Sequence, residues 1–251
     1  MTSTIFETRL TQKIPRVGDI VSFRFSRPDG YEYAAGQWHV VTIPADPEAL
    51  THHFTHSSSP TEPHLEFTTR LRGTAFKNRL DALPLGTAVE MEGPFGSFTM
   101  DAATPLNPVS TGGATVGGGP RQLVFITGGI GITPVRSILR WQADSGMAPP
   151  TLLIYANSSE QTIAFRDEID HVAETLPDFR AVYVVSRPSP AWIGRRGHID
   201  ADLLAEELNG LAAATYYMSG PPSMVQAIRE ALMSRGVDRG CIKTELFEGY
   251  D

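Results

Sequence analysis

A run of strand-forming residues that ends in closely spaced glycines constrains the fold of this chain more than any other feature. The segment FITGGIGITP places Gly128, Gly129 and Gly131 directly after apolar residues and follows them with Thr133 and Pro134. Glycine in a fixed structure costs about 0.5–1 kcal/mol relative to alanine, so this spacing needs a compensating role. A strand that runs through glycines into a helix brings backbone N–H groups close to phosphate oxygens. The segment therefore predicts a nucleotide diphosphate site.

The residues after the glycines indicate where the helix begins. Thr133 is expected to be the N-cap and Pro134 the first helical residue, where the missing N–H of proline costs nothing. The spacing differs from GxGxxG and from a Walker loop, so the motif does not decide which nucleotide binds. A tight glycine turn without any ligand is the alternative interpretation.

Bulk composition excludes several classes of protein. The chain has 251 residues, enough for one large domain or two modest ones, and a net charge of −7 that argues against nucleic-acid binding. Neither a signal peptide nor a membrane-spanning segment is expected. The single cysteine, Cys241, rules out a disulfide within the chain and a cysteine-ligated iron–sulfur cluster. No metal site is predicted, and we expect a cytoplasmic protein.

The first hundred residues are dominated by segments typical of short β-strands. Apolar and polar residues alternate in 19–28, 36–44, 64–73 and 88–98, with turn residues between the segments. One amphipathic helix, 74–83, interrupts them. This pattern predicts a small antiparallel β-barrel.

The middle of the chain changes composition. Residues 101–120 are rich in Gly, Pro, Ser and Thr and contain no aromatic residue. Such a segment buries little apolar surface and is typical of a connector or a long surface loop. We therefore expect a first domain at 1–103, a linker or loop at 104–119 and a second domain at 120–251.

Strands and helices alternate after this segment. Apolar runs without polar alternation lie at 121–128, 151–157, 179–186, 215–220 and 241–247, and helical segments separate most of them. Such runs are typical of a parallel sheet that is covered on both faces. The second domain is therefore predicted to be a doubly wound α/β domain with a five-stranded parallel sheet.

Six short motifs occur in the order found in one known family. They are HHFTHSSSP (52–60), RLRGTAF (70–76), GPFGSF (93–98), GGIGITP (128–134), MSGPPSM (218–224) and ELFEGY (245–250). On these motifs, the chain resembles the ferredoxin–NADP⁺ reductase-like flavoproteins over nearly its whole length, apart from the glycine-rich segment. The resemblance implies an FAD-binding barrel followed by an NAD(P)-binding domain.

For the first domain, the resemblance implies which residues bind FAD. Phe54 would lie against the flavin and Thr55 would place a hydroxyl near its reactive nitrogen, while His52 replaces the arginine of many members. Arg70 would compensate for that loss of charge, although a solvated strand face is the alternative. The full expected FAD set is His52, Phe54, Thr55, His56, Ser57, Ser58, Arg70, Gly73, Thr74, Ala75 and Phe76.

For the second domain, the resemblance implies a coenzyme site and a place for hydride transfer. Ser219 stands where many members have cysteine, and Glu245 and Tyr250 match family residues near the flavin and nicotinamide. With Thr55, Ser219 and Glu245 form the expected catalytic set; a C-terminal tail merely docked on the surface is the alternative for Tyr250. The expected coenzyme set is Gly129, Gly131, Ile132, Thr133, Ser186, Arg187, Arg195, Gly220, Pro221, Met224 and Tyr250.

The ends of the second and third strands of this domain favour NADPH, with NADH as the alternative. Ser186 and Arg187 resemble the pair that binds the 2′-phosphate in NADPH users, and Arg195 lies nearby in the sequence. Only Glu160 offers an acidic group that would favour NADH. The resemblance thus implies an enzyme that passes hydride from NADPH to FAD and electrons to a separate acceptor, such as a ferredoxin, an oxygenase component or a small molecule. A non-catalytic flavin-binding electron-transfer subunit or redox sensor is the alternative.

Overall fold

The computed structural model describes the chain except residues 1–2, 46–47, 101–121, 148, 209–213 and 248–251. The chain divides into two compact units: Met1–Met100 with Thr133–Asp144, and Asp101–Ile132 with Ser145–Asp251. The expected linker, 104–119, and Tyr250 lie outside the described residues. No helix in the described ranges is long and apolar enough to cross a membrane.

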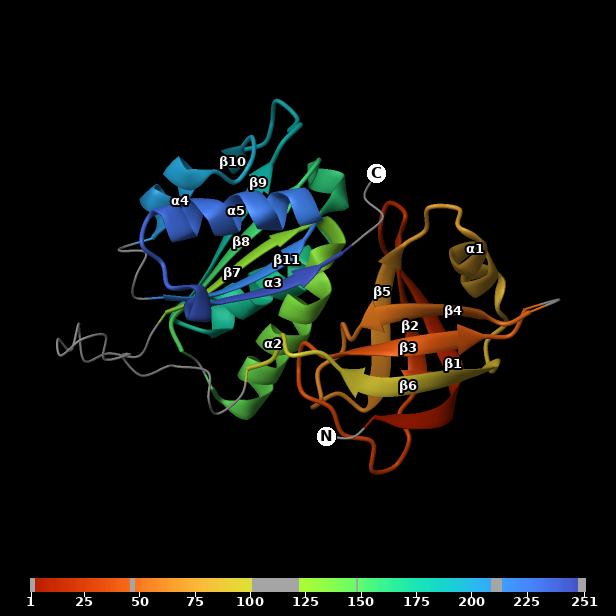
Figure 1. Ribbon diagram of the computed structural model, residues 1–251. Helices are drawn as coiled ribbons and strands as arrows, with labels where there is room; N and C mark the ends of the chain where they lie inside the picture. Colours follow the sequence, from red (N-terminus) through yellow and green to blue (C-terminus); the bar gives the residue numbers. More distant parts are fainter. Residues whose placement is uncertain (1–2, 46–47, 101–121, 148, 209–213, 248–251) are drawn as a thin grey trace. The chain divides into compact units, whose positions relative to one another are not determined.

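The first unit contains an antiparallel sheet of six strands in the order β4-β3-β6-β1-β2-β5 (Figure 1). The edge strands β4 and β5 meet where His56 bridges Phe67, so the sheet curls into a half-barrel. The antiparallel half of the fold prediction is confirmed in this form. The strands are β1 (Thr4–Val17), β2 (Ile20–Ser26), β3 (Trp38–Ile43), β4 (Leu50–Thr55), β5 (His64–Arg70) and β6 (Ala88–Phe95).

Aromatic side chains fill the interior of this sheet. The Phe67 ring lies in the middle of the cluster and stacks on Phe54, with ring centroids 4.2 Å apart, and on Phe25 at 5.3 Å. The predicted helix is confirmed as α1 (Ala75–Ala82), whose Phe76 and Leu80 are buried against the same core. Burial of such side chains contributes roughly 1.5–3 kcal/mol each.

The longest strand, β1, was missed by the sequence analysis. Its 14 residues include only two buried positions, Thr8 and Leu10, so the alternation of apolar residues is weak. The strand pairs with β6 through its first half and with β2 through its second half. Pairing with two neighbours therefore defines this strand more than its own pattern does.

The second unit contains a parallel sheet of six strands in the order β10-β9-β8-β7-β11-β12. The predicted parallel sheet is confirmed, but the count of five strands is wrong. The sixth strand, β10, is a two-residue pairing with the end of β9, too short to give a periodic signal. The strands are β7 (Gln122–Gly128), β8 (Thr151–Asn157), β9 (Phe179–Val185), β10 (Arg195–Arg196), β11 (Ala214–Gly220) and β12 (Ile242–Leu246).

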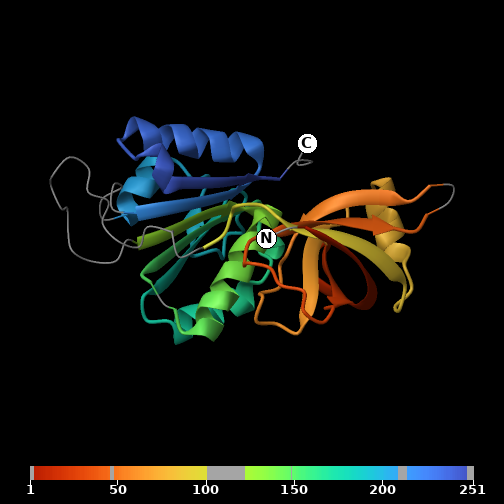
Figure 2. The ribbon, with the colours of Figure 1, turned by 60° about the horizontal axis from the view of Figure 1, so that its bottom comes forward.

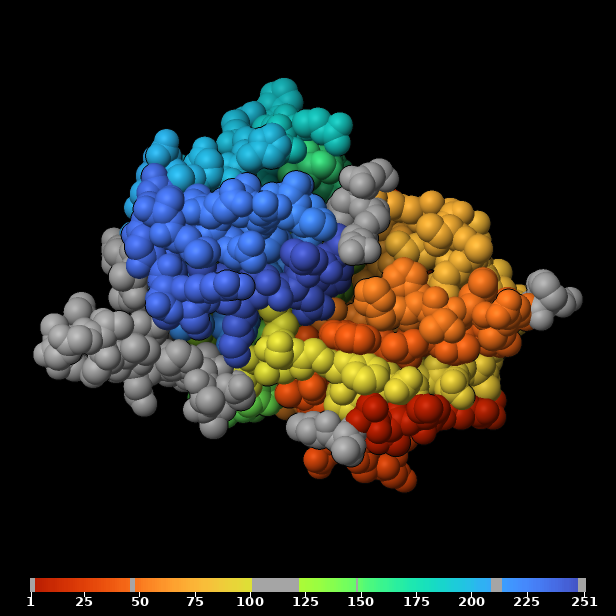
Figure 3. All heavy atoms as spheres, viewed as in Figure 1, coloured from red at the N-terminus to blue at the C-terminus, as the bar shows by residue number. Residues whose placement is uncertain are grey.

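Helices cover both faces of this sheet, as Figure 2 shows for α5 and α3. On one face, Leu204 of α4 (Ala201–Glu207) and Ile228 of α5 (Pro222–Ser234) pack in one cluster with strand residues. On the other, Asp170 of α3 (Arg166–Thr175) accepts a hydrogen bond of 2.6 Å from the Tyr183 hydroxyl. Side chains of α5 form a broad surface of this unit in Figure 3.

The start of the helix after the glycines differs from the prediction. The helix after the glycines, α2, spans Ile132–Ser145 and follows a short 3₁₀ turn, η1 (Gly129–Gly131). Gly131 is its N-cap, so the expected capping role of Thr133 is wrong and Pro134 is the third helical residue. The 3₁₀ turn carries the chain into helical geometry before Thr133 is reached.

Candidate functional site

The carboxyl ends of β7 and β11 meet at the point where the strand order reverses. β8, the next strand along the chain, pairs with one edge of β7. β11 pairs with the opposite edge of β7 and places Ser219 opposite Thr127. Ligands of open α/β sheets bind at such reversal points. The Ser219 hydroxyl, fully buried, donates a hydrogen bond of 2.8 Å to the Gly131 carbonyl oxygen and lies 3.3 Å from Thr127 Oγ1.

Glycine allows the two strand ends to approach closely. A Cβ atom on Gly131 would lie 2.5 Å from the Ser219 carbonyl oxygen and 2.8 Å from the Gly220 Cα atom. A Cβ atom on Gly128 would lie 2.8 Å from Met224 Sδ and 3.0 Å from Pro221 Cδ. The loop, the end of β11 and the start of α5 therefore form one tightly packed surface in which several expected coenzyme residues lie together.

Two further residues support the loop, and one of them was missed by the sequence analysis. The Tyr155 hydroxyl on β8 donates a hydrogen bond of 3.0 Å to the Gly129 carbonyl oxygen, and Gly129 has a φ of 52° that favours glycine. Tyr155 lies inside an apolar run that gave no functional signal. Ile132 is fully buried beside the loop.

The last described strand brings Glu245 next to Ser219. The two residues are opposite each other in the parallel pairing of β11 with β12, and Glu245 is half-buried. Two members of the expected catalytic set therefore share this edge of the second unit.

The ends of β8 and β9 are tied together by backbone hydrogen bonds. The Ser186 N–H donates to the Asn157 carbonyl oxygen at 3.0 Å, and the Arg187 N–H donates to that of Ser158 at 2.9 Å. The Glu160 carboxylate accepts a hydrogen bond of 2.7 Å from the Ser189 N–H, which lowers the pKa of Glu160. This acidic group is therefore engaged by the loop that follows β9.

The two arginines expected near a 2′-phosphate differ in their partners. Arg195 forms ion pairs with Glu207 at 2.7 Å and Glu206 at 2.9 Å. The Arg187 side chain is exposed, and in the described ranges its guanidinium has no ion pair or hydrogen bond. Arg187 is therefore better placed than Arg195 to bind an anion through its guanidinium.

In the first unit, three cationic side chains gather around the start of α1. Burial and the nearby positive charges of Arg72 and Arg70 lower the pKa of Lys77. Thr74 caps the helix by accepting a hydrogen bond from the Lys77 N–H, and Gly73 has a φ of +75° that bends the chain into this start. With Ala75 and Phe76 at the first helical positions, the arrangement combines a helix N-terminus with three cationic side chains, of which Arg70 pairs with Asp19 at 3.1 Å; such a combination favours an anion.

The residues of β4 lie beside this basic cluster. His52 stacks on Phe54, with ring centroids 4.8 Å apart, and burial lowers the pKa of His52, with a smaller effect from the charge of Lys77. Phe54 is 8% exposed and also stacks on Phe67, so most of its ring is in the core. Thr55 ends the strand and is buried.

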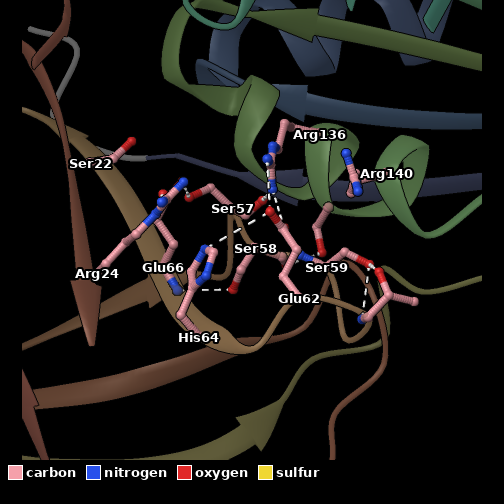
Figure 4. A network of polar contacts seen from close by, with 12 residues as sticks. Ser22, Arg24, Ser57, Ser58, Ser59, Glu62, His64, Glu66, Arg136 and Arg140 are labelled. Carbon is pink, nitrogen blue, oxygen red and sulfur yellow. Dashed lines mark hydrogen bonds and ion pairs between the residues drawn. The ribbon is translucent and has the colours of Figure 1, made fainter. Parts of the chain in front are cut away.

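The expected residues after Thr55 use their side chains inside the unit. His56 is fully buried and its Nε2 lies 3.1 Å from Nδ1 of His39. The Ser57 hydroxyl donates to Glu66 at 2.9 Å, and the Ser58 hydroxyl accepts a hydrogen bond from the Glu66 N–H at 2.9 Å. Figure 4 shows this network of polar contacts.

A buried ion pair, missed by the sequence analysis, lies beside the same segment. Arg136 of α2 contacts both carboxylate oxygens of Glu62, and it donates a hydrogen bond of 2.9 Å to the Ser57 carbonyl oxygen. Burial raises the pKa of Glu62, but the hydrogen bonds and charge of Arg136 more than offset it and hold that pKa below its usual value. Neither residue stands in a motif, so no sequence signal indicated the pair.

The chain is similar in sequence to several known oxidoreductases. The family model described as Oxidoreductase NAD-binding domain matches residues 125–230. Ferredoxin–NADP reductase B of Sorangium cellulosum is 29% identical over 253 residues, covering 97% of this chain and 98% of that protein. The reductase component of propane 2-monooxygenase from Rhodococcus jostii is 29% identical and covers 96% of this chain, which spans 63% of that longer protein.

A solved structure shares the fold of the whole chain. The ferredoxin NADP⁺ reductase from Neisseria gonorrhoeae, solved with bound FAD and NADP, has a TM-score of 0.80 at 19% identity and covers 96% of this chain and 98% of its own. The order of the motifs, the division into two units and the similarity of sequence over nearly the full length all indicate a reductase of this kind. Over nearly its whole length the chain is similar to ferredoxin–NADP reductases and to oxygenase reductase components, and residues 125–230 match an oxidoreductase NAD-binding domain.

Proposed function

We propose that this chain is an NAD(P)H-dependent flavin oxidoreductase that binds FAD on its first unit and a nicotinamide coenzyme on its second. The observation that carries the proposal is the close packing of Gly131 against Ser219 at the strand reversal, the place where open α/β sheets bind their ligands. Bound FAD would accept hydride from the nicotinamide and release electrons singly or in pairs. The protein supplies binding and orientation.

The FAD diphosphate fits the basic cluster of the first unit. The charges of Arg72 and Arg70 act against that of Lys77 at the start of α1, only partly offset by Asp19, and an anion there would offset them further. The N–H groups of Ala75 and Phe76 would donate to the same phosphates. Thr55, at the end of β4, would orient the reactive edge of the flavin.

The coenzyme diphosphate fits the loop between β7 and α2. The loop is held from below by Tyr155 and from the side by Ser219, so its backbone is fixed before any ligand arrives. Preorganised groups of this kind reduce the entropy lost on binding. Ser219 and Glu245 would then shape the place of the nicotinamide ring.

We propose that NADPH is the preferred coenzyme. The exposed guanidinium of Arg187, next to Ser186, would bind the 2′-phosphate through charge-assisted hydrogen bonds. Glu160 is held by the Ser189 N–H, which reduces its ability to serve the ribose hydroxyls that NADH presents.

The electron acceptor is proposed to be separate from this chain. The sequence has one cysteine, so it cannot ligate an iron–sulfur cluster of the four-cysteine type. Its relatives include a ferredoxin–NADP reductase and an oxygenase reductase component. A ferredoxin, an oxygenase component or a small molecule would fill this role.

Anaerobic mixing tests the proposal. The purified protein should be yellow, and NADPH should bleach the flavin absorbance faster than NADH does. A dye acceptor should then support steady turnover. A protein whose bound flavin neither coenzyme bleaches would overturn the assignment as an enzyme, and equal rates with both coenzymes would overturn only the preference for NADPH.

A further inference from the structure

The backbone that follows Thr55 is held by two separate polar groups. The Ser57 carbonyl oxygen accepts a hydrogen bond of 2.9 Å from Arg136, while the Ser57 hydroxyl donates to the buried Glu66 carboxylate (Figure 4). One residue further, the Ser58 carbonyl oxygen accepts a hydrogen bond of 2.6 Å from the Ser137 hydroxyl. Two successive carbonyl groups therefore bind to two successive residues of α2.

Glu62 fixes the orientation of the Arg136 guanidinium. The contact is bidentate, which sets both the position and the plane of the guanidinium. Glu62 itself accepts a hydrogen bond of 2.7 Å from the Ser59 N–H, so the same segment also binds the carboxylate. The Arg136 and Glu62 side chains are 7% and 12% exposed, which protects the pair from screening by solvent.

The position of Arg136 in the sequence gives this contact its significance. Arg136 is the fifth residue of α2, a helix that begins at Ile132 directly after the Gly129–Gly131 turn. The anchor at Arg136 therefore holds the Ser57 carbonyl group against the first turns of α2, and Ser137 does the same for Ser58. These contacts all lie within the first unit, to which Thr133–Asp144 belong.

We propose that Arg136, oriented by Glu62, is a positioning residue for hydride transfer. It fixes the segment from Thr55 to Ser57, proposed to orient the flavin, against the first turns of α2. The inference rests on the proposed function of that segment. Because misplacement of reacting groups by about 1 Å can reduce a rate about 100-fold, loss of the bidentate contact should lower hydride transfer more than it lowers cofactor binding.

The test compares Arg136→Lys with a matched control on the same helix. Lysine keeps the charge but loses the fork that binds Glu62 and Ser57 together. Arg140 forms an ion pair with Asp144 at 2.9 Å and makes no hydrogen bond to Ser57 or Glu62 in the described residues. Arg140→Gln therefore serves as the control. For each protein we would measure FAD per chain, the thermal midpoint, and the rate of flavin bleaching as the NADPH concentration is raised to saturation.

The expected result is a change in rate at saturation. Arg136→Lys should bleach at least about tenfold more slowly than the unchanged protein at saturating NADPH, with the same FAD content and the same NADPH concentration at half-maximal rate. Dithionite should bleach both at the same rate, because it needs no coenzyme. The Arg140→Gln protein should stay within about twofold of the unchanged protein.

A second variant keeps the test decisive if Arg136→Lys does not fold. Glu62→Asp retains the charge and shortens the side chain, so it should also slow bleaching at saturation while FAD stays bound. The slowing should not multiply in the double variant, because both changes break one contact.

Two outcomes are read separately. Rates equal to the unchanged protein in both variants, or slowing that merely follows loss of FAD, would overturn the positioning role alone. Absence of bleaching by NADPH and NADH in the unchanged protein would overturn the proposed function, and this inference with it.

Discussion

The Ser219 hydroxyl donates a hydrogen bond of 2.8 Å to the Gly131 carbonyl oxygen, joining the end of β11 to the turn before α2, 88 positions away in the sequence. Both residues pack without space for another atom between their backbones. The turn Gly129–Gly131, proposed to bind the coenzyme, is therefore closely packed against the end of β11, and changes at either residue should reveal how far hydride transfer depends on it.

Replacing Gly131 by valine should remove reduction by NADPH. The Cβ atom would meet the Ser219 and Gly220 backbone at under 3 Å, and backbone cannot move aside as a side chain can. Such overpacking costs about 1–3 kcal/mol and displaces the loop. We expect the rate of flavin bleaching by NADPH to fall at least about 100-fold while FAD stays bound and dithionite still bleaches it. An unchanged rate would show that the loop does not bind the coenzyme.

Replacing Ser219 by alanine should have a smaller effect on both stability and rate. The Gly131 carbonyl oxygen would lose a buried donor, at a cost of about 1 kcal/mol, or about 2–4 °C in the thermal midpoint. Ser219→Cys keeps a weak donor and should fall between alanine and serine. Calorimetry and stopped-flow bleaching measure the two effects. A thermal midpoint that the alanine variant leaves unchanged would contradict the role given to this hydrogen bond.

Replacing Arg187 by alanine should reduce the preference for NADPH. Loss of a charge-assisted contact to the 2′-phosphate, worth about 1.5–3 kcal/mol, predicts a fall of about 10- to 100-fold in kcat/KM for NADPH with little change for NADH. Steady-state kinetics with a dye acceptor measure both coenzymes. Arg235→Ala, which removes an arginine from the far end of α5, is the matched control. Equal losses for NADPH and NADH would contradict a contact to the 2′-phosphate.

The pair of buried histidines in the first unit should make stability fall in mild acid. Burial lowers the pKa of His39 to about 3, and burial with the charges of His39 and Arg27 lowers the pKa of His56 well below its usual value. Below about pH 6.5 the unfolded chain therefore binds protons that the folded chain does not, and stability decreases as the pH falls. Each histidine contributes up to about 1.4 kcal/mol per pH unit.

Thermal unfolding between pH 7 and pH 5 measures this slope. A His39→Gln protein, which removes one of the two titrating groups, should have a shallower dependence in this range. Burial also lowers the pKa values of His52 and His64, so the slope should decrease without vanishing. The exposed His171 gives a control, His171→Gln, for the loss of a histidine side chain outside the core. Identical slopes in all three proteins would contradict the assignment.

Local patterns in the sequence were sufficient for much of the architecture. Alternating apolar and polar residues in the first hundred positions predicted an antiparallel sheet, and continuous apolar runs after residue 120 predicted a parallel one. These patterns are local because a strand buried on one face alternates apolar and polar residues, whereas a strand buried on both faces is apolar throughout. The glycines at 128–131 predicted the turn between β7 and α2 for the same reason. The helix start at Thr74 was predicted from neighbouring residues alone.

Tertiary structure decided what depends on residues far apart in the chain. It replaced Thr133 by Gly131 as the cap of α2, paired Arg195 with two glutamates, and brought Arg136 to Ser57 across 79 positions. It also made a strand of β1, which has little pattern of its own. A motif predicts the local structure that a segment forms with its neighbours in sequence. Strand register and helix packing determine which charged groups and carbonyl groups come into contact. Neither the register nor the packing can be read from local patterns in one sequence.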